Sequence, residues 1–394
     1  MPLTIGVPAE TFPDERRTAL TPRATEVLAK SGVEFVIEAG SGAQAGYPDA
    51  DYLPKGVRIA NSRMEVFETA SVVIQVRTYG ANPEAGTRDL AMLRNGQTVI
   101  GFGEPLTSGH RYAELAERGV TSFAMELMPR ITRAQAMDAL SSMATIAGYK
   151  AVLIAADALP RMFPMLMTAA GTVAPARVLV LGAGVAGLQA IATARRLGAV
   201  VRAYDVRPAV KEQVESLGAK FVSVELDAAG AEDKSGYAKA LGDEFYQRQR
   251  DLLAAAVEDS DAVITTAAVP GQKAPLLVTR EMIAAMASGS VIVDLAAERG
   301  GNCEATRPGE TVVESGVRVI GPLNLPSTVP YHASQMYARN VATFLKHLIH
   351  DGALALNTED EITRETLVTH QGEVVHPRVR AQLSREETQP DAVR

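Results

Sequence analysis

Residues 177–187 read RVLVLGAGVAG, an apolar run followed at once by a glycine-rich loop. The run has the length of a buried strand, and apolar side chains recur at helical spacing from the loop to Leu197. In such a unit Gly182 permits a tight turn, Gly184 lets a pyrophosphate approach the backbone, and Gly187 lets the helix pack closely on the strand. The helix N-terminus also presents free N–H groups to phosphate. The stretch therefore predicts the dinucleotide site of a Rossmann domain.

A carboxylate closes the next predicted strand. Asp205 lies 18 residues after Gly187, where a carboxylate accepts hydrogen bonds from the adenosine ribose hydroxyls. The same negative charge would repel a 2′-phosphate, so we expect NAD(H) to be preferred over NADP(H). Arg207, two residues further on, could bind a 2′-phosphate, so NADP(H) stays open as the alternative cofactor.

Strand-like and helix-like segments alternate along both halves of the chain. The second half has six strand-like segments, the number in a complete Rossmann sheet: Arg177 to Leu181, Val200 to Asp205, Lys220 to Val224, Asp261 to Thr266, Ser290 to Leu295 and Val317 to Gly321. The first half has five: Leu3 to Val7, Val33 to Ile37, Ser71 to Val76, Gln97 to Gly101 and Thr121 to Met125. This alternation predicts an α/β fold of two doubly wound, Rossmann-like domains with parallel sheets.

Each series of strand-like segments is followed by a long helical stretch. Ala136 to Leu159 follows the first series, and His332 to His350 follows the second. We interpret the first as a helix that links the domains. A polar tail that needs a surface to pack on follows the second, so the simplest arrangement returns this part of the chain to the first domain. The predicted domains are residues 1–140 with 331–394, and residues 141–330 as the NAD(H)-binding Rossmann domain, with a cleft between them.

Composition argues against several classes of protein. The 394 residues carry a formal net charge of −7 and no block of lysine and arginine, so we expect no nucleic-acid partner. The one cysteine, Cys303, cannot form an intrachain disulfide, which fits a reducing compartment. We expect neither a secretory signal nor a membrane helix, because no apolar run reaches about 18 uninterrupted residues. If a membrane is involved, a partner chain is expected to supply it.

Several long stretches resemble domain I of the proton-translocating transhydrogenases. They are residues 125–142 (MELMPRITRAQAMDALSS), 147–149 (AGY), 168–173 (TAAGTV), 175–177 (PAR), 188–190 (LQA) and 211–218 (KEQVESLG). The resemblance extends over the chain to about Pro377. Alanine dehydrogenases are similar in architecture and share the element from Arg17 to Pro22.

The resemblance implies a soluble, homodimeric unit that binds NAD(H). Hydride would pass directly to or from NADP(H) on a beta subunit or domain, which makes the assembly a Re/Si-specific transhydrogenase, and a membrane-spanning subunit would couple the transfer to proton translocation. The chain would then be cytoplasmic and attached to the inner membrane through its partners. Hydride transfer between two nicotinamides needs close approach rather than an acid, a base or a metal.

The resemblance also implies which residues handle the nicotinamide. Arg130 and Gln135 match the loop at the nicotinamide end, and Asp138 and Ser141 extend that site. An amide such as Gln135 can hold the carboxamide or ribose, Arg130 can neutralise pyrophosphate or orient the carboxamide, and Asp138 can hold Arg130 in place.

The family places further residues against the nucleotide. Residues 233–239 form a polar segment that suits a lid, and Tyr237 holds the position of a tyrosine that covers the nucleotide. Together with the glycine loop, the predicted NAD(H)-binding residues are Gly182, Gly184, Val185, Gly187, Asp205, Val206, Arg207, Gly236, Tyr237, Gln249 and Ala268.

Two other functions stay open. An alanine dehydrogenase needs a cation for the substrate carboxylate, a lysine for the carbonyl and an acid or base. Arg17 is present, but the strand that would supply the lysine ends at Arg77, and the next ends at Glu104 without a histidine. An arginine cannot give up a proton as a lysine can, which argues against this function. The other alternative is an NAD-binding module without catalysis.

Overall fold

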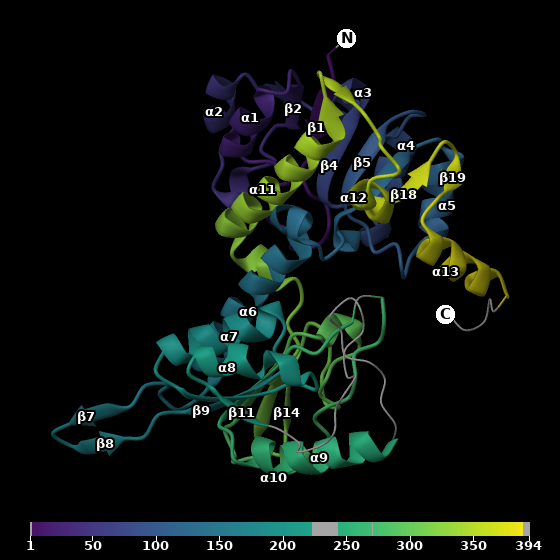
Figure 1. Ribbon diagram of the computed structural model, residues 1–394. Coiled ribbons are helices and arrows are strands. Elements are labelled where there is room, and N and C mark those ends of the chain that lie inside the picture. Colours follow the sequence, from purple (N-terminus) through teal and green to yellow (C-terminus); the bar gives the residue numbers. More distant parts are fainter. Residues whose placement is uncertain (1, 223–242, 270, 389–394) are drawn as a thin grey trace. The chain divides into compact units, whose positions relative to one another are not determined.

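The computed structural model describes residues 2–222, 243–269 and 271–388. The chain divides into two compact units, Met1–Met143 with Ser327–Arg394, and Ala144–Pro326 (Figure 1). Each unit is a mixed α/β structure around its own sheet. The α/β fold with two largely parallel sheets predicted from the sequence is confirmed.

The sheet of the first unit has eight strands in the order β19-β18-β6-β5-β4-β1-β2-β3. Six are parallel: β1 (Thr4–Val7), β2 (Glu34–Glu38), β3 (Arg58–Ala60), β4 (Val72–Arg77), β5 (Thr98–Phe102) and β6 (Thr121–Ala124). The remaining two, β18 (Leu367–His370) and β19 (Glu373–Val374), extend the sheet in antiparallel fashion. The parallel strands have the doubly wound order 3-2-1-4-5-6.

The three strands at the two ends of this sheet are not predicted by the sequence pattern. Strand β3 is only three residues long, too short for a periodic signal. Strand β18 lies more than 200 residues from its neighbour β6, to which it is joined by the hydroxyls of Ser122 and Thr369, 2.7 Å apart. The polar tail thus packs as an extension of the first sheet.

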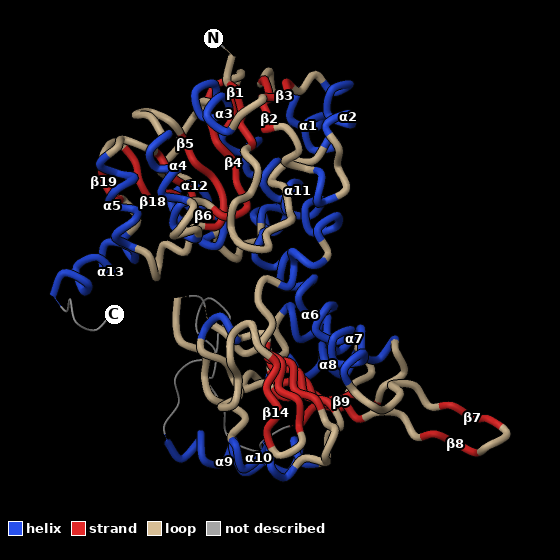
Figure 2. Tube along the Cα trace, turned by 180° about the vertical axis from the view of Figure 1, so that it is seen from behind, coloured by secondary structure: helices blue, strands red, loops and turns tan. Residues whose placement is uncertain are grey.

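The helices of the first unit surround this sheet (Figure 2). They are α1 (Pro22–Ala29), α2 (Asp49–Tyr52), α3 (Arg63–Thr69), α4 (Gly86–Met92), α5 (Gly109–Glu117), α11 (Pro330–Leu348), α12 (Glu361–Thr366) and α13 (Pro377–Thr388). The long helix α11 buries one apolar stripe, and its Tyr337 hydroxyl donates to the carbonyl of Gln75 on β4 at 2.7 Å. Phe344 of the same helix packs edge-on against Phe123 of β6. The C-terminal part of the chain therefore completes the core of the first unit.

The sheet of the second unit has seven strands in the order β11-β10-β9-β12-β13-β15-β14. They are β9 (Arg177–Leu181), β10 (Val200–Tyr204), β11 (Lys220–Val222), β12 (Ala262–Thr265), β13 (Val291–Asp294), β14 (Thr311–Glu314) and β15 (Val317–Ile320). All six predicted strands are present and parallel. The seventh, β14, is an antiparallel edge strand joined to β15 by Ser315 and Gly316, which both have positive φ, as a tight hairpin requires.

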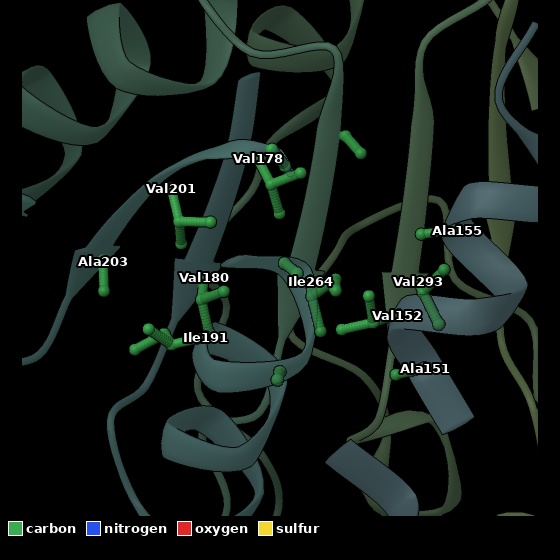
Figure 3. Packing of buried hydrophobic residues seen from close by; sticks show 14 of the residues in the cluster. Ala151, Val152, Ala155, Val178, Val180, Ile191, Val201, Ala203, Ile264 and Val293 are labelled. Atoms are coloured by element: carbon green, nitrogen blue, oxygen red, sulfur yellow. The ribbon is translucent and has the colours of Figure 1, made fainter. Parts of the chain in front are cut away.

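Alternate side chains of β9 enter two separate cores. Val178 and Val180 pack with α6 (Ala139–Ala158) and α7 (Val185–Arg196), as Figure 3 shows. Leu179 and Leu181 pack instead with α9 (Asp243–Glu258) and α10 (Arg280–Ala285). A strand buried on both faces is typical of a doubly wound parallel sheet. The remaining described helix of this unit is α8 (Lys211–Ser216).

Helix α6 is long and apolar enough to cross a membrane by length and composition, with a mean hydropathy of 1.4. It was not predicted as a membrane helix because Asp157 and Pro160 break the apolar run from Ala151 to Ala158. Its small residues Ala151 and Ala155 lie fully buried against the second sheet (Figure 3). A core helix passes the same test of length and composition, so the finding is weak evidence for a membrane span.

A two-stranded hairpin, β7 (Leu166–Thr168) and β8 (Gly171–Val173), extends away from the rest of the second unit in both Figure 1 and Figure 2. No hairpin was predicted here from the sequence. Met165, Met167 and Val173 on or beside it are exposed, Met167 to 77%.

Candidate functional site

The three glycines of the loop after β9 have three different environments. Gly182 has φ of +97°, where a side chain would be strained. A Cβ on Gly187 would lie 1.8 Å from the carbonyl oxygen of Gly182, so only glycine allows α7 to pack against the loop. A Cβ on Gly184 would meet nothing within 4 Å, and Gly184 has an ordinary extended backbone. Gly184 is thus free of any packing reason to be glycine, which fits a position kept bare for a ligand.

The N-terminus of α7 opens directly beside this bare position. Gly184 is the N-cap residue and offers no side-chain cap, and Val185 is exposed. The first N–H groups of a helix have no partner within the helix and, with the helix dipole, favour a bound phosphate. The loop therefore has the geometry that a pyrophosphate needs.

Asp205, directly after β10, lies against the glycine loop and is held by neighbours. One of its oxygens accepts the backbone N–H of Ala183 at 2.7 Å and Arg207 Nη2 at 3.0 Å. Its other oxygen accepts the backbone N–H and Nε of Arg207, both at 2.9 Å. A carboxylate has about four acceptor positions, so a ribose hydroxyl would have to displace the Arg207 side chain. This pairing was not predicted from the sequence.

A buried network that the sequence analysis missed shapes the loop after β12. Asn302 is fully buried, accepts the N–H of Ala267 at 3.0 Å and donates to its carbonyl at 2.8 Å. Asp294, at the end of β13, accepts the N–H of Asn302 at 2.8 Å and the hydroxyl of Thr265 at 2.7 Å. Ala268, which is predicted to bind NAD(H), directly follows the fixed residue Ala267 and is exposed. Because the asparagine and aspartate lie far from the loop in sequence, no local motif marks them.

Within the second unit, these elements meet at the carboxyl ends of β9, β10 and β12. The hydroxyl of Thr266, directly after β12, donates to the carbonyl of Gly182 at 3.0 Å, joining two of the three loops. Val206 is half-buried beside Asp205. Ligands of open α/β sheets bind at this edge, where the strand order reverses between β9 and β12.

Three predicted residues lie outside what the structure describes at the level of side chains. Gly236 and Tyr237 fall in residues 223–242, outside the described residues. Gln249 belongs to the backbone of α9, but its side chain is not among those described. The predicted roles of these residues stay predictions.

The residues predicted for the nicotinamide end belong to the first unit. Gln135 is exposed on a 3-10 turn, η5 (Thr132–Met137), and Arg130 is exposed just before it. Asp138 accepts the backbone N–H of Ser141 at 2.8 Å and its hydroxyl at 2.5 Å. Asp138 therefore caps the start of α6, a use of its carboxylate that the sequence analysis did not predict. The structure joins Asp138 and Ser141 to each other and presents Gln135 to solvent.

Both arginines that could bind the carboxylate of a keto acid lie beside the same glutamate. Arg17, 3% exposed, donates to both oxygens of Glu15, at 2.7 and 2.5 Å. The same Glu15 lies 3.5 Å from Arg77 Nε. One carboxylate thus lies against both arginines that a substrate carboxylate could use, with the closer pairing to Arg17. The sequence pattern points to Arg17 and Arg77 but not to Glu15.

A second buried carboxylate lies at the ends of β5 and β6. Glu126 Oε1 accepts the backbone N–H of Gly103 at 2.8 Å and of Glu104 at 2.5 Å. Burial, with the nearby charge of Glu104, raises the pKa of Glu126 to about 7. Across the residues that the structure describes, no group of three or more histidine, cysteine and acidic side chains could hold a metal ion.

Comparisons with known proteins agree with one another. Residues 6–147 match the family described as alanine dehydrogenase/PNT, N-terminal domain, and residues 151–377 match its C-terminal domain. The chain is 45% identical over 383 residues to the first portion of the NAD(P) transhydrogenase subunit alpha of Rhodospirillum rubrum, covering 96% of this chain and 100% of that one. It is 46% identical to a transhydrogenase crystal structure from Sinorhizobium meliloti, with a TM-score of 0.84 over 94% of this chain and all of the other. An L-alanine dehydrogenase structure is more distant, at 25% identity and a TM-score of 0.81 over 97% and 99% of the two chains.

Proposed function

Since the chain belongs to the alanine dehydrogenase/PNT family, and within it to the NAD(P) transhydrogenase alpha subunits, we propose that it is the NAD(H)-binding subunit of a proton-translocating transhydrogenase. Hydride would pass directly between NAD(H) on this chain and NADP(H) on a beta subunit. A membrane-spanning subunit would couple the transfer to proton movement and attach this chain to the cytoplasmic face of the inner membrane.

The observation that carries the proposal is the bare glycine at the start of α7. Gly184 has neither a packing nor a backbone reason to lack a side chain, and free helix N–H groups lie beside it. Asp205 stands at the end of the neighbouring strand, within 2.7 Å of the loop backbone. The residues present therefore fit a dinucleotide with its pyrophosphate on the loop and a ribose at Asp205.

The chain's own residues bind and orient rather than transfer protons. When bound, NAD(H) supplies or accepts the hydride at its nicotinamide ring. The α7 amides would hold the pyrophosphate, and Asp205 would hold the adenosine ribose once Arg207 moves aside. Gln135 and Arg130 would orient the carboxamide end, and the partner would exclude water from the transfer path. A site without a nucleophile suits this reaction.

The pairing of Glu15 supports this function over an amino-acid dehydrogenase. Using Arg17 for a substrate carboxylate would take away the two hydrogen bonds that its side chain donates to the buried Glu15. A hydrogen bond to a charged group is worth about 1.5–3 kcal/mol, and a small keto acid would have to offset the loss of these bonds. We therefore expect no turnover of alanine.

The direct test is hydride transfer with and without a partner. Reduction of an NAD⁺ analogue by NADPH is expected only when a purified NADP(H)-binding domain is added to this chain. A parallel sample with alanine and NAD⁺ should stay silent. Turnover of alanine by the chain alone would overturn the proposal, whereas silence with both assays would favour a binding module without catalysis.

NADH is expected to bind at least tenfold more tightly than NADPH, because a carboxylate at Asp205 repels a 2′-phosphate. A tenfold difference is about 1.4 kcal/mol. Arg207 neutralises part of that charge, so Arg207→Ala should widen the difference and Asp205→Asn should shrink it. Calorimetric titration of both nucleotides on all three chains measures this. Equal affinities in the unmodified chain would contradict the role of Asp205.

The exposed hairpin β7–β8 supports the proposed homodimer. A two-stranded hairpin is marginally stable alone, and exposed Met165, Met167 and Val173 leave it with apolar surface in water. A second copy of this chain can cover both hairpins by one symmetric contact. We propose that each hairpin packs on the other subunit.

Met167→Lys is therefore expected to convert the dimer to monomers. Burying a lysine in an apolar contact without a partner opposes association. Val313→Lys is the matched control, because Val313 is also exposed, to 69%, but lies on edge strand β14. Sedimentation equilibrium at a series of concentrations gives the dissociation constant. A monomeric unmodified chain, or a dimer that tolerates Met167→Lys, would refute the contact.

A further inference from the structure

The turn that carries Gln135 is tied down on both sides of that residue. Before it, Arg133 Nη1 donates to Asp360 Oδ2 at 2.6 Å. After it, the carbonyl of Ala136 accepts Asn340 Nδ2 at 2.9 Å. The side chains of Ala134 and Met137 in the same turn are buried. Gln135 therefore projects from a backbone whose neighbours on either side are anchored.

Asp360 is a fixed point rather than a mobile surface acid. Its Oδ1 accepts the backbone N–H groups of Ile362 at 2.8 Å and Thr363 at 3.3 Å, as the N-cap of α12. The same oxygen lies 3.2 Å from His347 Nε2 on α11. Partial burial opposes ionisation, but the bonds from Arg133 and the two amides outweigh it, and the pKa of Asp360 is lowered. The carboxylate is thus charged near neutral pH and held in one place.

The second anchor comes from the same C-terminal part of the chain. Asn340 lies on α11 and is only 5% exposed. Helix α11 is itself fixed to the first sheet through Tyr337 and Phe344. Both anchors of the Gln135 turn therefore come from the segment after residue 327, more than 200 residues along the chain.

We propose that Arg133 and Asp360 are positioning residues that hold Gln135 in place for hydride transfer. The role of Gln135 rests on the proposed function; the anchoring of its turn rests on the contacts above. The side chain of Arg133 is 50% exposed, so the ion pair contributes little to the stability of the fold. A reacting ring, in contrast, loses about a hundredfold in rate when misplaced by about an ångström. The pair should therefore affect the rate of transfer far more than folding.

Two single variants and their combination test the pair in the full-length chain with its NADP(H)-binding partner. Arg133→Ala removes the cation, and Asp360→Asn removes the charge while keeping a good N-cap for α12. Each should slow hydride transfer at least tenfold, with the dissociation constant for NADH and the unfolding midpoint unchanged. The double variant should be no slower than the slower single one, because both remove one interaction. Arg133→Lys, which keeps the charge, should recover part of the rate.

Arg58→Ala is the matched control. Arg58 forms an ion pair with Glu65 in the same unit and is similarly exposed, at 48%, but lies on edge strand β3. Its removal should leave the transfer rate unchanged. An equal loss of rate with Arg58→Ala, or independent effects of Arg133→Ala and Asp360→Asn, would overturn the proposal.

Hydrogen exchange at the amides of residues 131–137 gives a readout that needs no partner. Exchange there should be faster in Arg133→Ala and Asp360→Asn than in the unmodified chain, and unchanged in Arg58→Ala. Unchanged exchange in all chains would overturn the anchoring. Faster exchange with an unaltered transfer rate would overturn the positioning role. If the unmodified chain transfers no hydride, the proposed function fails, and with it the role in transfer, while exchange still decides whether the pair orders the turn.

Discussion

Gly184→Ala is expected to abolish tight NADH binding while leaving the fold intact. The added methyl group meets no protein atom within 4 Å, and the backbone at Gly184 is extended, so alanine fits without strain. It would instead occupy the space in which a pyrophosphate approaches the loop. We expect the affinity for NADH to fall by about a hundredfold or more, which corresponds to about 2.7 kcal/mol. The free energy of unfolding should change by less than about 0.5 kcal/mol.

Gly187→Ala is the matched comparison in the same loop. Its methyl group would lie 1.8 Å from the carbonyl oxygen of Gly182, so α7 must move away from the strand. Overpacking of this kind costs about 1–3 kcal/mol, and both NADH binding and stability should fall. Calorimetric titration and denaturant unfolding on the two variants separate the roles of the glycines. Unaltered NADH binding by Gly184→Ala would show that the loop does not hold the pyrophosphate.

Gln135→Ala is expected to slow hydride transfer by about a hundredfold with little change in NADH affinity. Gln135 is exposed on an anchored turn of the first unit, so its removal should not disturb the fold. In the proposed function it orients the nicotinamide and does not anchor the adenosine half, and loss of orientation reduces the rate rather than the binding. Arg130→Ala should behave in the same way.

The measurement is single-turnover transfer from NADPH-loaded partner to an NAD⁺ analogue on this chain, beside an NADH titration of each variant. Thr132→Ala serves as the control, because Thr132 is exposed at the start of the same turn. It should transfer hydride at the unmodified rate. A parallel fall of rate and affinity in Gln135→Ala would contradict the orienting role and indicate that the residue simply binds the nucleotide.

Local patterns were sufficient to predict the framework of both units. The apolar run before Gly182 was recognisable because a strand buried on both faces is continuously apolar. The five later strands were recognisable because short strand-like runs alternate with helical stretches. The glycine spacing could be interpreted because each position has its own steric requirement, and the structure shows a positive φ at Gly182 and a backbone contact at Gly187. The strands that were missed, such as β3 and β18, are short or pair with distant partners.

The side-chain contacts of the candidate site were harder to predict from the sequence than the framework of strands and helices. Asp205 was expected to face a ribose, and its pairing with Arg207 could not be predicted from the sequence. Asp138 was expected to hold Arg130, and the structure adds a use that was not expected, the capping of α6 through Ser141. Each carboxylate had several cations or N–H groups within a few residues, and the sequence does not say which of them its oxygens face.

The sequence by itself determined the α/β class, the two parallel sheets and the position of the glycine loop, because these depend on periodicity and on steric rules that act between near neighbours. Only the tertiary structure decided which distant groups meet. It joined Arg133 to Asp360 and placed Asn302 against Ala267. It also buried Glu15 between Arg17 and Arg77. Such contacts depend on how whole helices and strands pack, and the direction of a side chain in three dimensions is a property of that packing rather than of the residues beside it in the chain.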